Sequence, residues 1–133
     1  MADAPTAAEA VAVAEFRAAL RRFMRISERN ARAAGLTPQR YLLLLMIKGA
    51  TDGSERSTVT ELAERLQLAQ STVTELVGRA EETGFVKRER SSDDGRIAYL
   101  RLTDEGEERL AKAFTSNEQE RDELRATIAR LDG

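Results

Sequence analysis

Residues 60–103 constrain the fold more than any other part of the chain, because two short helical patterns and a basic hairpin pattern follow one another there. We expect the first helix to run from its cap at Thr60 to Leu66, and the second from about Gln70 to Thr83. Apolar residues at helical spacing anchor the second pattern; they are Val73, Leu76, Val77 and Ala80. The tight turn between the two patterns predicts a helix-turn-helix.

A hairpin pattern follows the second helix directly. Residues Val86 to Arg90 and Arg96 to Leu102 read as strands, and the SSDDG sequence between them contains Asp94-Gly95, a hairpin turn signal. A helix-turn-helix with this hairpin as its wing predicts a mainly α fold with a small β-hairpin wing.

Longer helical patterns flank this stretch. Residues 7–34 repeat apolar side chains at helical spacing and stop at Gly35, a C′ residue. Thr37-Pro38 begins a helix to about Lys48 that is apolar on nearly every side. After its cap at Thr103, the last helical pattern (104–131) contains three polar residues at 115–117, where we expect a break.

Composition excludes several classes of site. The 133 residues are expected to form one domain, 1–133, without cysteine or histidine. Disulfides and thiolate metal sites are therefore excluded, and we expect no catalytic site, no metal and no cofactor. The longest apolar run, 41–47, is too short to cross a membrane, and no signal peptide is visible. The expected location is the cytoplasm.

Net charge argues mildly against nucleic acid, because the chain carries −2 overall. The charge is distributed unevenly along the chain. Residues 87–101 carry five Lys or Arg against three Asp or Glu, whereas the segment from 104 onward carries five against nine. The acidic excess therefore lies mostly in the last segment, which need not face a duplex.

The second helix of the pair has the two unlike faces that reading DNA requires. Its anchored face leaves short polar side chains pointing outward, with Thr72 at the boundary. These candidate DNA contacts are Gln70, Ser71, Thr72, Thr74 and Arg79. Gln can pair with adenine, Ser and Thr can contact several groups, and Arg can bind a phosphate or guanine. Glu75 would repel phosphates, and we expect it to pair with Arg79 at i+4.

The wing offers a second contact surface. Arg96 follows the turn and is the best candidate for insertion into a minor groove, with Asp94 holding its guanidinium in position. Arg88 and Arg90, together with Lys87, are candidate phosphate contacts on the first strand. An alternative is that the basic hairpin is only a solvated edge guarded by charge.

Three quoted segments resemble the MarR family of winged-helix transcriptional regulators. GLTPQRYLLLLMI (35–47) is similar to the family's second helix, and LAERLQLAQSTVTELVGRAEETGFVKRE (62–89) to its helix-turn-helix and first wing strand. DDGRIAYLRLT is similar to the wing signature through Asp94, Arg96, Leu102 and Thr103. That spacing favours this family over the PadR-type regulators.

The resemblance implies a double-stranded DNA-binding homodimer, expected to be a repressor that reads a pseudo-palindromic operator. Helices 7–34 and 104–131 would form the dimer, and 36–103 the DNA-binding winged helix. It also implies a small, often phenolic, anionic effector, for which Arg40 and Tyr41 are the candidate pocket. The chain departs from the family at Gln67, where Gly is usual, and at Ala69, where a capping Ser, Thr or Asp is usual.

The residues themselves also favour a dimer. Arginines recur at i+4 steps in the first helix, at 17, 21, 25 and 29, and should face something acidic, such as the last helix. The apolar stripe of the first helix and Phe114, Leu124, Ile128 and Leu131 exceed what one small domain can bury. The alternatives are a solvated arginine face and, for the whole chain, a winged-helix protein-interaction module without DNA binding. A small enzyme ranks far behind, because no nucleophile–base pair or phosphate loop is visible.

Overall fold

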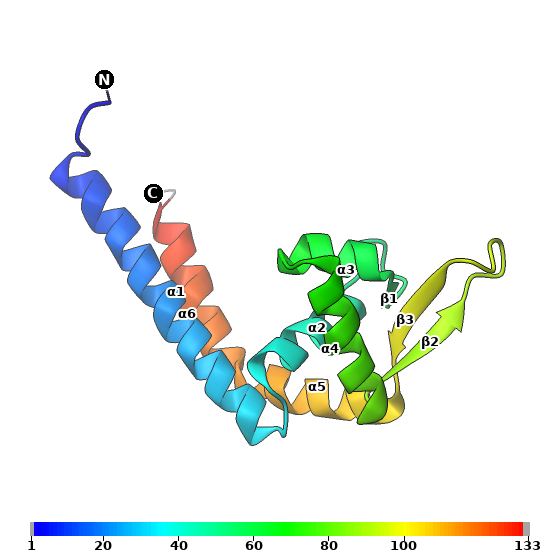
Figure 1. Cartoon of the computed structure of the whole chain (residues 1–133). Coiled ribbons are helices and arrows are strands. Elements are labelled where there is room, and N and C mark those ends of the chain that lie inside the picture. The colour runs from blue at the N-terminus through cyan, green and yellow to red at the C-terminus, as the bar shows by residue number, and fades with distance from the viewer. Residues whose placement is uncertain (1, 132–133) are drawn as a thin grey trace.

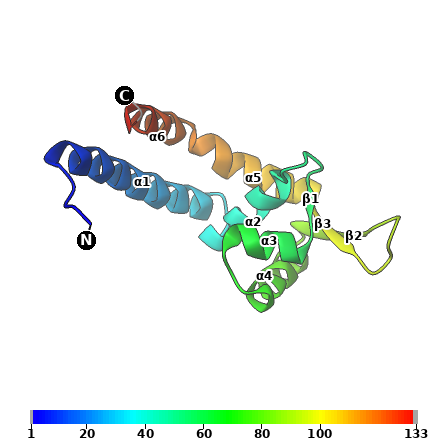
Figure 2. The same ribbon diagram turned by 90° about the horizontal axis from the view of Figure 1, so that it is seen from above.

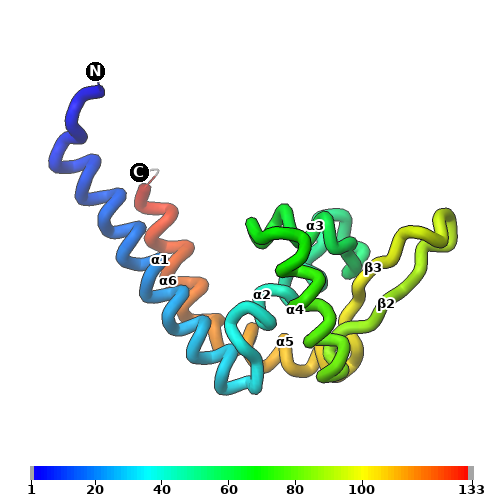
Figure 3. Tube along the Cα trace, in the orientation of Figure 1, coloured from blue at the N-terminus to red at the C-terminus, as the bar shows by residue number. Residues whose placement is uncertain are grey.

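The computed structural model describes residues 2–131, and it is mainly α-helical with a small antiparallel sheet, as predicted (Figure 1). Its elements in chain order are α1 (Ala7–Ala33), α2 (Pro38–Lys48), β1 (Arg56–Ser57), α3 (Val59–Leu66), α4 (Gln70–Glu82), β2 (Val86–Arg90), β3 (Ala98–Leu102), α5 (Asp104–Ser116) and α6 (Glu118–Leu131). We call α2–α4 with the sheet and α5 the head, and α1 with α6 the arm (Figures 1 and 3).

Threonine side chains cap four of the helices. Thr6, Thr37 and Thr103 each accept a hydrogen bond from a first-turn backbone N–H of α1, α2 and α5. The predicted cap of α3 at Thr60 is wrong, because Thr58 caps that helix. Thr58 Oγ1 accepts from the Glu61 amide (3.2 Å) while the Glu61 carboxylate accepts from the Thr58 amide (2.9 Å), a capping box unavailable to Thr60.

The sheet has the strand order β1-β3-β2, with both neighbouring pairs antiparallel. The predicted first wing strand matches β2, and the second begins at Ala98 instead of Arg96 because the hairpin turn extends further. Strand β1 was not predicted. Its two residues pair with β3, Arg56 opposite Arg101 and Ser57 opposite Leu100, and they fix the base of the hairpin to the loop after α2.

Helix α2 is the centre of the head, as its all-round apolar pattern predicts. Leu43, Leu44 and Ile47 are fully buried beneath α3, α4, α5 and β3. Helix α5 closes the base of the head, where Gly106 lies against the backbone of Phe85. A Cβ atom at Gly106 would come within 2.1 Å of the Phe85 carbonyl oxygen, so the close approach requires glycine.

The first and last helices lie side by side and leave the head together (Figures 1 and 2). Ala19, Phe23 and Ile26 of α1 line a small cavity together with Leu124 and Thr127 of α6. The break predicted in the last helical segment is confirmed, because α5 ends at Ser116 and α6 begins at Glu118, with Asn117 between them.

The apolar pattern at the start of α1 is not covered by any other part of residues 2–131. Val11 and Val13, near the free end of the arm, are more than half exposed. Helix α1 itself ends at Ala33, one residue before the predicted end. Within residues 2–131, none of the helices combines the length and apolar character that crossing a membrane requires.

Candidate nucleic-acid interface

Helix α4 has the two unlike faces expected from its sequence. Val73, Val77 and Ala80 are fully buried against the head, while Leu76 is half-buried. The opposite face exposes the predicted DNA contacts, apart from Thr72, which is half-buried at the boundary. The exposed ones are Gln70, Ser71, Thr74 and Arg79. The geometry thus presents a row of short polar side chains on a rigidly anchored helix.

The beginning of α4 differs from that of the four threonine-capped helices. Ala69 precedes the helix in an extended conformation and provides no capping hydrogen bond, as its side chain predicts. Gln67 takes the left-handed conformation (φ 57°) usually given to glycine and ends α3. The first-turn N–H groups of α4 therefore lack a capping side chain. Gln70 Nε2 donates to Thr60 Oγ1 (3.3 Å), which ties the start of α4 to α3.

Glu75 and Arg79 form an ion pair on the exposed face of α4. The Arg79 Nη2 to Glu75 Oε1 distance is 2.9 Å, and both side chains are about two-thirds exposed (63% and 66%). The expected i+4 pairing is therefore confirmed. Because it is solvent-exposed, the pair contributes only about 0–1 kcal/mol to stability, and Arg79 can exchange Glu75 for another anion at little cost.

The wing carries Arg96 at its tip, where the side chain is 92% exposed. Its backbone N–H donates to Asp94 Oδ1 (3.0 Å), and its Nε donates to the same oxygen (3.2 Å). These bonds, the backbone one first, hold the pKa of Asp94 below its ordinary value. Asp94 thus contacts Arg96 directly, and its role in positioning that guanidinium for DNA stays a prediction. Ser91 Oγ accepts from the amides of Asp93 and Asp94 and shapes the turn.

The cations of β2 are less free than the sequence suggests. Arg88 donates to the Glu81 carboxylate of α4 at 3.1 Å, and Arg90 donates to the Gly95 carbonyl oxygen at 2.6 Å. Sequence reasoning treated both as phosphate contacts, whereas here they also brace the wing against α4 and against its own turn. The Glu81–Arg88 pair gave no sequence signal, because its residues lie in different elements.

Two further cations hold the head together, and sequence reasoning missed both. Arg65 of α3 donates to the carbonyl oxygens of Met46 (3.2 Å) and Gly49 (3.0 Å), which satisfies the end of α2. Lys48 forms ion pairs with Glu107 (3.0 Å) and Glu55 (3.1 Å). Hydrogen bonds to Glu107 first, and then to Glu55, raise the pKa of Lys48. Arg65 and Lys48 fix α3 and α5 around α2.

The candidate ligand residues differ in exposure. Tyr41 is 5% exposed, and its hydroxyl accepts a hydrogen bond from the Asn117 side-chain amide at 3.5 Å. Arg40 is half-buried at the start of α2. Tyr41 therefore packs in the core in this structure, and a ligand pocket at these residues stays a prediction.

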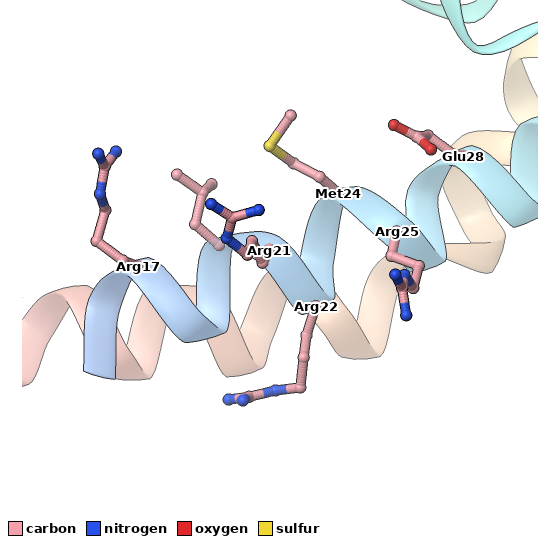
Figure 4. A pocket seen from close by; sticks show the side chains of 7 residues that line it. Arg17, Arg21, Arg22, Met24, Arg25 and Glu28 are labelled. Carbon is pink, nitrogen blue, oxygen red and sulfur yellow. The ribbon is translucent and has the colours of Figure 1, made fainter. Parts of the chain in front are cut away.

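A shallow hollow of about 590 Å³ lies along α1 (Figure 4). Its lining residues are Arg17, Leu20, Arg21, Arg22, Met24, Arg25 and Glu28. In Figure 4, Arg22 points to the opposite side of the helix from Arg17 and Met24. Among the ion pairs in residues 2–131, none joins α1 to α6, so the predicted pairing of the two helices by charge does not occur within one chain.

Comparisons with known proteins agree with this geometry. A family model described as MarR family matches residues 34–97, which include α2–α4 and the wing turn. An HTH-type transcriptional regulator of Bacillus subtilis (strain 168), YkoM, is 30% identical over 102 residues, covering 74% of this chain and 64% of YkoM. The repressor YetL of the same strain is 34% identical over 76 residues, covering 57% of this chain and 44% of YetL. The matches thus span less than two thirds of these relatives' lengths.

A solved structure extends the likeness to the arm. Sco3205, a MarR family transcriptional regulator from Streptomyces coelicolor in complex with DNA, is 25% identical, with a TM-score of 0.68. The superposition covers 92% of this chain and 77% of Sco3205, so it includes helices beyond the family model. The family model thus matches the head, and the likeness to a solved MarR family regulator covers nearly the whole chain, so the chain is similar to the MarR family in both sequence and fold.

Proposed function

We propose that this chain is a sequence-specific regulator of transcription that binds double-stranded DNA, with α4 in the major groove and the wing tip in the adjacent minor groove. One observation carries the proposal: α4 is anchored by fully buried Val73 and Val77, while its polar face and the 92% exposed Arg96 point outward. The uncapped start of α4 adds N–H groups that can donate to a phosphate.

Relatives support the same class of function. Sco3205 was solved in complex with DNA, and the curated relatives above are named as regulators of transcription, not as enzymes. YetL is named as a repressor, which supports repression as the direction of control here. The expected effector is also part of the proposal: a small phenolic anion that weakens DNA binding, and one that reaches the Tyr41 hydroxyl would have to displace its hydrogen bond from Asn117.

The protein is proposed to act as a homodimer formed through the arm. Large apolar side chains on the arm and its base remain exposed in the single chain, and they are Val11, Val13, Met24, Phe114, Ile128 and Leu131. The arginine-lined hollow on α1 would face acidic side chains of a second copy. Two α4 helices on a two-fold axis would then lie about 34 Å apart, one turn of DNA.

The dimer is tested by light scattering on the variant Arg21→Glu/Arg25→Glu. Both arginines line the hollow, so charge reversal is expected to lower the dimer fraction. Arg32→Glu is the matched control, because Arg32 is also exposed on α1 and does not line the hollow. An unchanged dimer in the double variant would indicate a solvated arginine face.

DNA binding is tested by selecting bound sites from random duplexes and measuring affinity at several salt concentrations. Because each neutralised phosphate releases counterions, the logarithm of the affinity should fall linearly with the logarithm of the salt concentration, with a slope of about −0.9 per contact. The competing function is a winged-helix module that binds another protein. The chain's net charge of −2 favours it, and absence of duplex binding at low salt would support it.

A further inference from the structure

A buried polar cluster lies where the arm leaves the head. Asn117, the single residue between α5 and α6, is 1% exposed, which is unusual for a polar side chain. Its Oδ1 accepts from Asn30 Nδ2 at 2.7 Å, and its Nδ2 donates to Ser27 Oγ (3.3 Å) and to the Tyr41 hydroxyl (3.5 Å). One amide therefore joins α1, α2 and the junction of α5 with α6.

The backbone around Asn117 is fixed at the same point. Its amide donates to the Phe114 carbonyl and ends α5, and its carbonyl accepts from the Arg121 amide and begins α6. Asn30 Nδ2 also donates to the Ser116 carbonyl oxygen (3.1 Å). Because a buried amide that loses its partners costs about 1–3 kcal/mol, other angles between the two helices are disfavoured.

We propose that Asn117 sets the angle between arm and head, and thereby determines which half-site spacing the dimer accepts. The spacing part rests on the proposed function. Helix α6 has 14 residues and is therefore about 21 Å long. A rotation of about 10° at Asn117 would move its far end by about 4 Å, close to the base-pair step of about 3.4 Å. A small change in the angle at this junction therefore displaces the far end of α6 by about one base-pair step of an operator.

The angle is measured in the free protein, so that this result does not depend on DNA. Since the chain contains no cysteine, spin labels can be placed at Glu82→Cys on α4 and Ala126→Cys on α6, both exposed. An excess of unlabelled protein restricts the measured distances to pairs within one chain. Asn117→Ala is expected to broaden or shift the distance distribution, while Gln119→Ala, whose exposed side chain bonds only along α6, leaves it unchanged.

A second variant keeps the test informative if Asn117→Ala fails to fold. Ser27→Ala/Tyr41→Phe removes both acceptors of the Asn117 amide and keeps the apolar packing. It should broaden the same distribution. If every folded variant retains the wild-type distribution, Asn117 does not set the angle and the proposal is overturned.

The spacing is measured by affinity for duplexes whose half-site centres are about 9 to 12 base pairs apart, around the one-turn spacing. Wild-type protein is expected to prefer one spacing by about tenfold, which corresponds to about 1.4 kcal/mol, and Asn117→Ala to lose that preference or move it. An unchanged ranking in a variant with altered distances would overturn the spacing claim. Wild-type protein that binds no duplex would refute the proposed function instead. The distances between the spin labels would still show whether Asn117 sets the angle between arm and head.

Discussion

Replacing Gly106 with alanine should destabilise the protein, although the same change usually stabilises a helix. Alanine is favoured over glycine inside a helix by about 1 kcal/mol. At Gly106, however, the new Cβ would lie 2.1 Å from the Phe85 carbonyl oxygen and 3.0 Å from its carbon. Thr103 holds that carbonyl in place through its amide (3.0 Å), so α5 must move by about 1 Å to restore ordinary contact distances. Overpacking of this kind costs about 1–3 kcal/mol.

Gly78→Ala is the matched control. Gly78 also lies inside a helix, α4, but a Cβ there would meet nothing within 4 Å. Urea unfolding followed by circular dichroism, at one fixed protein concentration, should show a lower midpoint for Gly106→Ala and a slightly higher one for Gly78→Ala. Equal midpoint increases in the two variants would show that α5 approaches Phe85 less closely than described, and the reasoning would be refuted.

Three further predictions concern the cap, the wing and alkaline pH. Ala69→Thr, which gives α4 the cap that the threonine-capped helices have, should raise the free energy of unfolding by about 0.5–2 kcal/mol; an unchanged urea midpoint would contradict this. Arg96→Ala should weaken binding to a selected duplex by about 1–3 kcal/mol in fluorescence anisotropy and leave the dimer and the urea midpoint unchanged, since the side chain is 92% exposed; wild-type affinity would remove the wing tip from the mechanism. Because the pKa of Lys48 is raised in the folded protein, its contribution to stability is fully present below the ordinary value of 10.5 and is lost as pH rises through the folded-state pKa. Lys48→Met should therefore reduce the fall in unfolding temperature between about pH 10 and 12. An equal fall in the variant and the wild type would show that the Lys48 ion pairs do not stabilise the protein.

The sequence predicts the head well because its elements carry strong local signals. The periodic apolar residues of α4 lie on its buried face, and Asp94-Gly95 marks the hairpin turn. Thr103 was correctly identified as a cap. At α3 two threonines compete, and Thr58 caps because Glu61 stands three residues after it, a spacing that Thr60 lacks. Local chemistry therefore distinguishes the two threonines, because only Thr58 can form the capping box.

Contacts between distant segments were not predictable in the same way. Strand β1 has two residues, too few to show a period, and it forms only because β3 lies beside it. The Arg88–Glu81 ion pair depends on how the wing folds back on α4. Asn117 lies among polar residues, so nothing in its neighbourhood indicates a buried side chain, and the partners that bury it come from α1 and α2.

The pairing of the first helix with the last has a consequence for how the protein is made. Asn30 and its partner Asn117 are 87 residues apart, so α1 leaves the ribosome long before the helix that covers it has been synthesised. The residues of α2 through β3 form one continuous segment with shorter loops to close, and they can pack first. During translation the apolar side chains of α1 therefore remain exposed until α6 has been synthesised. This nascent stage is the one at which the chain most needs protection from aggregation.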